Sequence, residues 1–137
     1  MRSVCFAAVV AVLAGLSGGA RAATPVTAEQ FQLNTTADLV ALCGSDKSDP
    51  LYTAAQNFCH GFAVGTYRAL AAVESASRSK QKWFCMPTPA PTRDEAITKF
   101  VTWAAPRTDI LGMSPTDGVL AYFQDAQPCA QTGGKRK

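Results

Sequence analysis

Apolar residues recur at helical spacing along most of this chain, and capping residues mark the points where helices begin. The first such pattern predicts a short helix over 37–43, with Thr35 or Thr36 as its N-cap. Leu39 and Cys43 lie four residues apart and therefore share one face of this helix. That face is expected to pack on the rest of the domain.

The longest helical pattern begins at Asp49 and Pro50, because Asp is a good N-cap and Pro suits the first turn, and it continues to about Ser77. Its core face is predicted from residues at three- or four-residue steps: Leu51, Ala55, Phe58, Phe62, Thr66 and Leu70. Gly61 and Gly65 each cost about 1 kcal/mol of helix propensity. We therefore expect another backbone to approach closely there, either from the same chain or from a second subunit.

Two further helices follow in the second half of the chain. Thr92 and Glu95 form a capping-box pattern that opens a third helix, which Pro106 ends. A cap followed by a first-turn proline at 114–115 opens a fourth helix, which ends before Cys129. No stretch alternates with period two between hairpin turns. The sequence thus predicts an all-α fold of about four helices.

The first 22 residues have the organisation of a signal peptide. Arg2 supplies a positive charge, an apolar run over 4–16 follows, and 20–22 form a small-x-small cleavage site. The apolar run is shorter than the roughly 20 residues that cross a bilayer. We expect cleavage after residue 22, export to the periplasm and no stable membrane insertion.

The rest of the chain is long enough for one domain and too short for two. Residues 23–34 hold few apolar anchors and predict a flexible arm, 35–129 the helical domain, and 130–137 a disordered basic tail. Without Arg2 and Arg21 the formal net charge falls from +3 to +1, and no element carries a basic stripe. Binding to nucleic acid is therefore not predicted.

Cys43, Cys59, Cys85 and Cys129 remain once Cys5 leaves with the signal peptide. An even number of cysteines in a small exported domain is typical of a disulfide framework. Three connectivities are possible. Helical placement favours Cys43 with Cys59 and Cys85 with Cys129, because each pair then ties a helix end to its neighbour without crossing the other bridge. No C-x-x-C pair is present, so neither a metal site nor thiol exchange is predicted.

No catalytic constellation stands out in the sequence. His60 follows Cys59, but adjacent helical residues point about 100° apart, which prevents the hydrogen bond that would activate a nucleophile. His60 is therefore predicted to be a surface or half-buried residue. Asp94, Glu95 and Asp117 lie at helix N-termini, where capping and the helix dipole explain them. We predict no enzyme activity, no cofactor and no metal, and a protein that acts by binding another protein.

Several cysteine-containing segments together form a pattern that resembles a known family: Leu42-Cys43, Phe58-Cys59-His60-Gly61-Phe62 with Gly65, Phe84-Cys85-Met86-Pro87, and Pro128-Cys129. The pattern covers roughly 35–129 and resembles the Rap/Tai family of immunity proteins. These are periplasmic helical proteins that protect a bacterium from peptidoglycan-cleaving amidase effectors delivered by type VI secretion. The resemblance implies a homodimer that clamps the effector, with a protruding loop that enters the amidase cleft and blocks substrate.

The loop that matches this description lies between the third and fourth helices, at 105–113. It combines a stiff entry at Pro106, hydrogen-bonding side chains, apolar residues and a flexible glycine. Its candidate partner-binding residues are Arg107, Thr108, Asp109, Ile110, Leu111 and Met113. The alternative is that the three apolar members of this set cover the core.

A different class of function also fits the size and compartment, namely a stress-related periplasmic chaperone or scaffold. An acid-activated chaperone should expose apolar surface as its carboxylates become protonated. This chain instead has few charges to lose and is expected to depend on disulfides. Inhibition of a cell-wall hydrolase is therefore the leading hypothesis.

Overall fold

The computed structural model describes residues 24–77 and 82–129. These ranges hold a 3-10 helix and five α-helices, with no strand among them: η1 (Gln30–Gln32), α1 (Thr36–Cys43), α2 (Tyr52–Ala76), α3 (Arg93–Ala104), α4 (Thr108–Leu111) and α5 (Pro115–Ala126). The all-α prediction is confirmed. The additional helix, α4, is a single turn inside the loop that was expected to join the third and fourth helices. The predicted signal peptide and basic tail lie outside the described residues.

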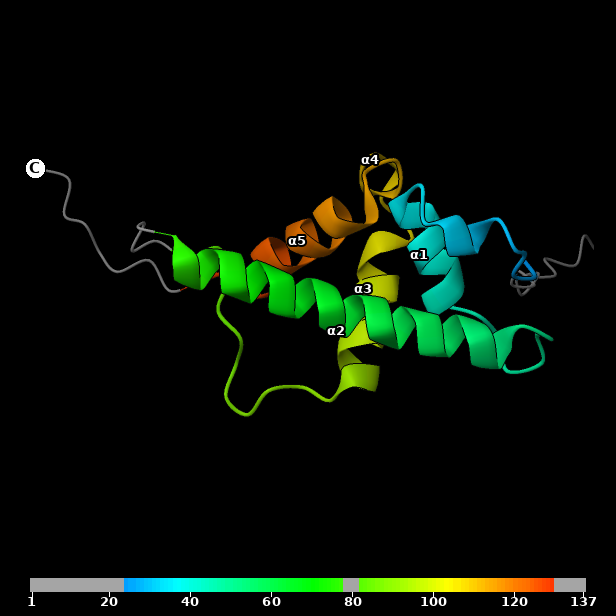
Figure 1. Cartoon of the computed structure of the whole chain (residues 1–137), viewed down its shortest axis with the longest axis horizontal. Helices are drawn as coiled ribbons and strands as arrows, with labels where there is room; N and C mark the ends of the chain where they lie inside the picture. Colours follow the sequence, from blue (N-terminus) through cyan, green and yellow to red (C-terminus); the bar gives the residue numbers. More distant parts are fainter. Residues whose placement is uncertain (1–23, 78–81, 130–137) are drawn as a thin grey trace, which may run out of the picture.

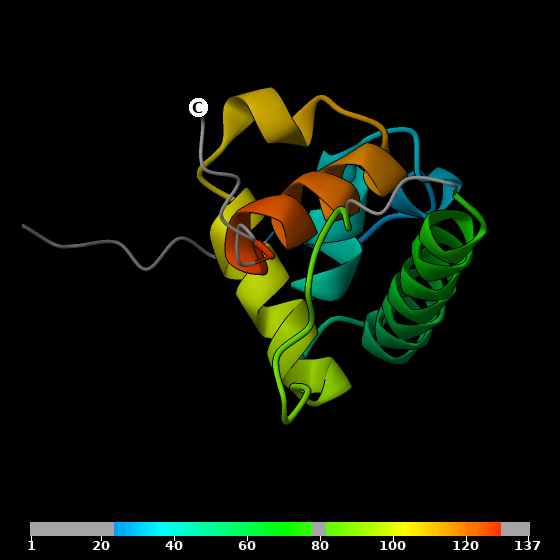
Figure 2. The same ribbon diagram turned by 90° about the vertical axis from the view of Figure 1, so that its left-hand side faces the viewer.

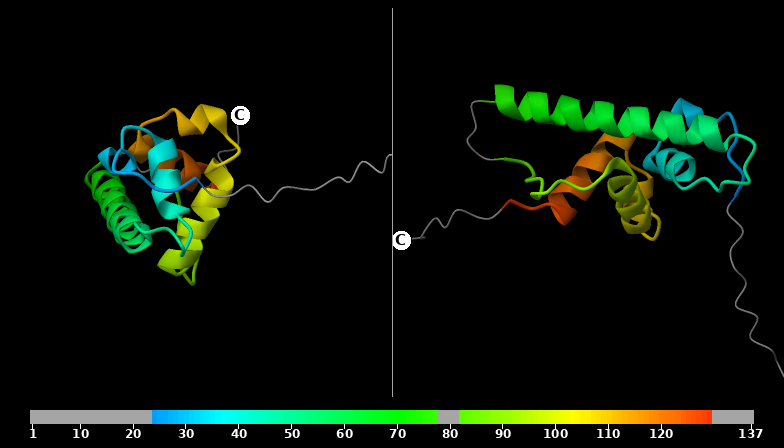
Figure 3. Two further views of the ribbon diagram at one scale, coloured as in Figure 1. Left: turned by 90° about the vertical axis from the view of Figure 1, so that its right-hand side faces the viewer. Right: turned by 90° about the horizontal axis from the view of Figure 1, so that it is seen from below.

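The long helix α2 runs along the whole length of the domain, and α1, α3 and α5 all pack against the same side of it (Figures 1 and 3). The one-turn helix α4 contacts α1 and α5 and lies at the edge of the domain away from α2 (Figure 2). One side of α2 is consequently covered by α1, α3 and α5, whereas part of its remaining surface is exposed.

Three helices begin at the caps that the sequence predicts. Capping boxes open α1 and α3, where the hydroxyls of Thr35 and Thr92 accept the backbone N–H three residues on, at 3.4 and 3.3 Å. The carboxylates of Asp38 and Glu95 in turn accept the N–H of the cap residue. The bonds from Thr92 lower the pKa of Glu95. Ser114 caps α5 with Pro at the first helical position.

The start of α2 differs from the prediction, because the helix begins at Tyr52 rather than next to Asp49. The Asp49 carboxylate accepts hydrogen bonds outside the helix. Its Oδ1 accepts the N–H of Leu51 at 2.7 Å, which closes a turn before the helix, and its Oδ2 accepts the N–H of Val26 at 2.7 Å. Asp49 therefore fixes the entry turn and the N-terminal segment together.

The segment 24–34, expected to be a flexible arm, packs on the domain. Val26 is 7% exposed and lies with Leu42 and Ala55 in a small apolar cluster. Phe31, just before the end of this segment, places its ring edge-on to a phenylalanine of α2 at 5.5 Å between centroids. Few apolar residues suffice to hold the segment because they cover the seam between α1 and the start of α2.

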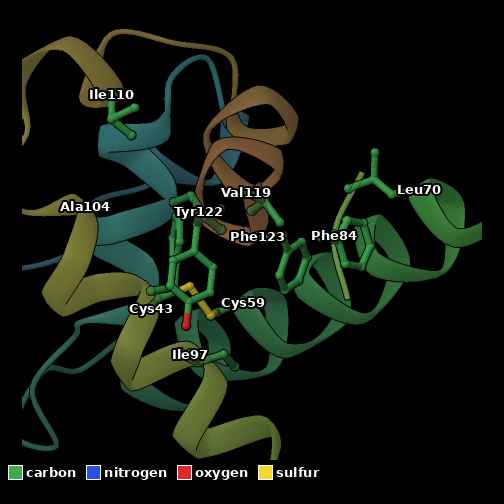
Figure 4. Packing of buried hydrophobic residues seen from close by; sticks show 12 residues of the cluster. Cys43, Cys59, Leu70, Phe84, Ile97, Ala104, Ile110, Val119, Tyr122 and Phe123 are labelled. Atoms are coloured by element: carbon green, nitrogen blue, oxygen red, sulfur yellow. A yellow bond between two sulfur atoms is a disulfide. The ribbon is translucent and has the colours of Figure 1, made fainter. Parts of the chain in front are cut away.

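The core lies where α1, α3 and α5 meet α2. One disulfide joins α1 to α2, and the other joins the segment after α2 to the segment after α5. The pairing Cys43 with Cys59 and Cys85 with Cys129 is confirmed. The first bridge is buried in the centre of the cluster (Figure 4). The second anchors the segment after α2, where the ring of Phe84 stacks on that of Phe123 at 4.8 Å.

Helices α1 and α5 approach each other closely in the core, at Gly118. A Cβ atom built on Gly118 would lie 2.2 Å from the Oγ1 of Thr36, which is fully buried. That hydroxyl donates to the carbonyl of Ser114 at 2.9 Å, so it cannot turn away without breaking a buried hydrogen bond. Gly118 is therefore required for the packing of α5 on α1.

Replacing Gly118 with alanine is expected to lower the free energy of unfolding by about 1–3 kcal/mol, the usual cost of an overpacked core. The gain in helix propensity, at most about 1 kcal/mol, offsets only part of it. Urea denaturation measures the difference. Gly112→Ala is the matched control, since nothing lies within 4 Å of a Cβ there. Equal stabilities of the two variants would contradict the close contact.

Candidate functional site

The loop between α3 and α5, residues 105–114, is an ordered one-turn structure. The N–H of Arg107 donates to the carbonyl of Ala104 at 2.9 Å, which carries the chain out of α3. The single turn α4 follows, and the N–H of Met113 donates to the carbonyl of Ile110 at 3.0 Å. We refer to residues 105–114 as the α4 loop.

The first end of the α4 loop is fixed by the Arg107 side chain. Its guanidinium carbon lies 4.4 Å from the ring centroid of Trp103, within the range of a cation–π contact. The same guanidinium donates to the carbonyl of Trp103 and lies 3.6 Å from the Asp125 carboxylate. Asp125 also accepts the indole N–H of Trp103 at 2.6 Å. Arg107 therefore holds the loop on α3 and α5 rather than projecting from it.

The second end of the α4 loop is fixed by α1. The backbone N–H of Thr36 donates to the carbonyl of Met113 at 2.8 Å, and its hydroxyl bonds both the Met113 and Ser114 carbonyls. Ile110 points into the core and is 7% exposed. This burial agrees with the alternative that the apolar residues of the loop cover the core, because Ile110 seats α4 on the domain.

The outer face of the α4 loop combines free polar groups with apolar surface. The side chains of Thr108 and Asp109 are exposed, and neither has a hydrogen-bond or ion-pair partner in the part of the chain that the structure describes. Leu111 is half-buried and Met113 is 39% exposed. A loop fixed at both ends loses little conformational entropy when it binds, so these four side chains are already positioned for a partner.

Sequence reasoning identified the loop but missed the residues that hold it. Trp103 precedes Arg107 by four positions, but Pro106 ends the predicted helix between them and Arg107 is extended, so helical spacing does not indicate this contact. Asp125 and Thr36 are distant in sequence, and only the packing of α5 and α1 brings them to the loop.

The side of α2 that faces away from the core forms a second notable surface. Nothing within the described ranges lies closer than 4 Å to a Cβ built on Gly61 or Gly65, so the expected close approach within the chain is wrong. Leu51 and Phe58, predicted to be core residues, are each 37% exposed, and Val73 is 56% exposed. We call these five residues, with Ala54, Ala69 and Ala72 between them, the open face of α2; Leu51 directly precedes the helix, and the ring of Phe58 also contacts that of Phe31.

The lone histidine takes part in a surface ion pair. The Nε2 of His60 lies 3.3 Å from the Asp94 carboxylate, and the His60 side chain is 33% exposed, which confirms a half-buried helix residue. In the described ranges no three His, Cys, Asp or Glu side chains gather as a metal site. The same ranges contain no helix with the length and apolar character of a membrane span.

A model of the Rap1a immunity protein family matches residues 35–129. The chain belongs to this family. The match runs from the cap of α1 to the last cysteine and includes both disulfides, the α4 loop and the open face of α2. Searches of curated proteins and of solved structures found no significant match. Membership in the Rap1a family makes this an immunity-type protein, which implies a protein effector as its partner.

Proposed function

We propose that this immunity protein acts in the periplasm, where it binds a peptidoglycan amidase effector and blocks its active site with the outer face of the α4 loop. The observation that supports this proposal is the combination of a loop fixed at both ends with two exposed polar side chains that have no partner within 24–77 and 82–129. Thr108 and Asp109 offer a hydroxyl and a carboxylate, which can bond the polar groups that line an amidase cleft. The apolar surface of Met113 can exclude water around them.

Export to the periplasm follows from the predicted signal peptide and agrees with the two disulfides, since such bridges persist in oxidising compartments. The effector would be delivered to this compartment, where its peptidoglycan substrate lies. The protein itself is proposed to have no enzymatic activity. Its effect is to occupy the cleft, so inhibition is expected to be stoichiometric.

The test begins with a search of the neighbouring genes for a small secreted amidase, which is then produced and purified. Titration with the immunity protein should abolish peptidoglycan hydrolysis at one immunity chain per amidase, and co-production of both in the periplasm should rescue growth. Normal hydrolysis in the presence of excess immunity protein, together with no complex on gel filtration, would overturn the proposal.

We also propose that the protein is a homodimer in which two copies meet through the open face of α2. The paired glycines allow two helix backbones to approach closely, and Leu51, Phe58 and Val73 supply the apolar area around them. An exposed apolar strip on a long helix is typical of an interaction site. A symmetric dimer would place the same strip on both partners.

Replacing Gly65 with arginine is expected to convert the dimer to a monomer, because a long charged side chain keeps the backbones apart. The helix itself should not suffer, since arginine has about 1 kcal/mol better helix propensity than glycine. Sedimentation velocity over a range of concentrations measures the association. Thr53→Arg, an exposed position on the polar flank of α2, is the control. A wild-type protein that stays monomeric at every concentration would contradict the proposed dimer.

A further inference from the structure

A cavity of about 310 Å³ opens between α2, α3 and the segment 82–92. Its inner wall is apolar and comes from α1, α3 and α5, with Leu39, Ile97, Phe100, Val119 and Phe123 among the lining side chains. Four of these five are core residues that are 4–9% exposed, and Leu39 is 1% exposed. The volume is at the lower end of the range for small-molecule sites. Water in a cavity with such walls finds few hydrogen-bond partners, so its displacement by an apolar group is favourable.

The segment 82–92 covers part of the cavity and is held at both ends. At its start the N–H of Cys85 donates to the carbonyl of Gln127 at 2.8 Å, next to the Cys85–Cys129 disulfide. At its end Thr92 is fixed in the capping box of α3. Between these anchors the chain arches from beneath α2 to the start of α3 (Figure 1). Met86, Ala90 and Pro91 of this arch line the cavity.

The charged groups around the cavity are predominantly positive. Arg68 of α2 and Arg93 of α3 line it, and both are exposed. In the ranges that the structure describes, neither guanidinium has a hydrogen-bond or ion-pair partner. His60 also lines the cavity and is paired with Asp94, whereas no Asp or Glu is among the described lining residues. Two unpaired guanidiniums at an apolar cavity favour an anionic group attached to an apolar body.

One polar atom in the inner wall has no partner among the residues that the structure describes. Tyr122 is 5% exposed, and its hydroxyl forms no hydrogen bond with any described residue. Figure 4 shows this hydroxyl pointing towards α3 and the Cys43–Cys59 disulfide, on the side where the cavity lies. No fully buried side-chain oxygen in the described part of the chain lacks a partner, so the hydroxyl must reach the cavity space. Among the described lining residues of α1 and α5, Tyr122 is thus the one with a hydrogen-bonding side chain.

We propose that this cavity binds a small amphipathic carboxylate, such as a medium-chain fatty acid. The acyl chain would lie against the walls from α1, α3 and α5, and the carboxylate would bond Arg68 and Arg93. The Tyr122 hydroxyl would remain available to a second oxygen on the ligand. The site is separate from the proposed effector-binding surface, since α4 and the arch over the cavity lie on opposite sides of the domain (Figures 1 and 2).

The test is calorimetric titration of the oxidised protein with decanoate below its micelle concentration. We expect saturable binding of one decanoate per chain, and no saturable binding of decylamine, which has the same chain and the opposite charge. The variant Arg68→Gln/Arg93→Gln should bind decanoate at least tenfold more weakly. Lys99→Gln, an exposed charge on α3 outside the cavity, is the matched control and should bind normally. Equal binding of decanoate and decylamine, or no binding of either, would overturn the proposal.

Two further variants separate the cavity from a general surface effect. Ala96→Phe fills the cavity from α3 and should abolish decanoate binding while circular dichroism shows the same helix content. Tyr122→Phe should leave the thermal midpoint unchanged, because the hydroxyl bonds none of the described residues; a fall of several degrees would contradict the geometry. Co-sedimentation with phosphatidylglycerol vesicles, in place of binding to free decanoate, would assign the two arginines to a membrane surface and reject an enclosed site.

Discussion

Removal of the Cys85–Cys129 disulfide is expected to lower the free energy of unfolding by about 4 kcal/mol, a large share of the stability of a small domain. The bridge closes a loop with a sequence separation of 44, so its loss releases much chain entropy in the unfolded state. Both cysteines are half-buried, so alanine at these positions leaves little cavity. The cost in Cys85→Ala/Cys129→Ala should therefore be almost entirely that of loop closure.

The Cys43–Cys59 bridge provides the comparison that tests this reasoning. Its separation of 16 predicts a smaller loop-closure cost, about 3 kcal/mol. Its sulfurs are buried in the core, however, since Cys59 is fully buried and Cys43 is 8% exposed. Alanine here adds a cavity cost to the loss of the bridge, so the two alanine pairs should be destabilised by similar amounts.

Serine distinguishes the two bridges, and urea denaturation of the four double variants measures the difference. At Cys43 and Cys59 two hydroxyls would enter an apolar core, which costs about 1–3 kcal/mol for each group left without a partner. At Cys85 and Cys129 serine and alanine should behave alike. A larger penalty for serine at the half-buried pair would show that burial has been assigned to the wrong bridge.

Helix boundaries set by neighbouring residues could be predicted from the sequence, and those set by distant contacts could not. The capping boxes at Thr35 and Thr92 involve residues three positions apart, so their pattern is visible in the chain. Asp49 followed by Pro50 has the same local appearance. Its carboxylate instead bonds the N–H of Val26, a contact across 23 positions that no local pattern reveals.

The glycines show the same limit. The sequence drew attention to Gly61 and Gly65 because glycine is costly in a helix, yet both lie on an open surface. The glycine that admits a close approach is Gly118, near the start of α5, where its cost looks unexceptional. Gly118 differs from the other two because Thr36, on another helix, lies directly against it. The sequence alone does not show that α1 and α5 are in contact.

The sequence predicted where the loop of the candidate site begins and ends, but not which of its side chains are exposed. Pro106 and the cap at Ser114 placed a loop between two helices, and the structure has a loop there. Which side chains of the loop are exposed depends on how α4 packs on α1 and α5. The packing of α4 on these two helices buries Ile110, and Arg107 contacts Trp103. The exposed polar side chains of the loop that bond no described residue are then Thr108 and Asp109.

Alanine at all three positions 107–109 is expected to weaken inhibition of the cognate amidase by roughly 30-fold to 1,000-fold, which corresponds to about 2–4 kcal/mol. The loss from Thr108 and Asp109 and the loss from Arg107 should have different causes. Thr108→Ala/Asp109→Ala removes only exposed side chains, so it should weaken binding without changing the thermal midpoint. Arg107→Ala removes the contacts to Trp103 and Asp125, so it should weaken binding by loosening the loop and should also lower stability.

The measurement is titration of the amidase with each variant, followed by a thermal melt monitored by circular dichroism. Thr98→Ala/Lys99→Ala, an exposed polar pair on α3, controls for the loss of surface polarity and should inhibit normally. Undiminished inhibition by a folded Thr108→Ala/Asp109→Ala variant would show that the α4 loop does not enter the amidase cleft. If Arg107→Ala alone weakened binding with no change in the melt, the guanidinium would contact the effector directly instead of holding the loop.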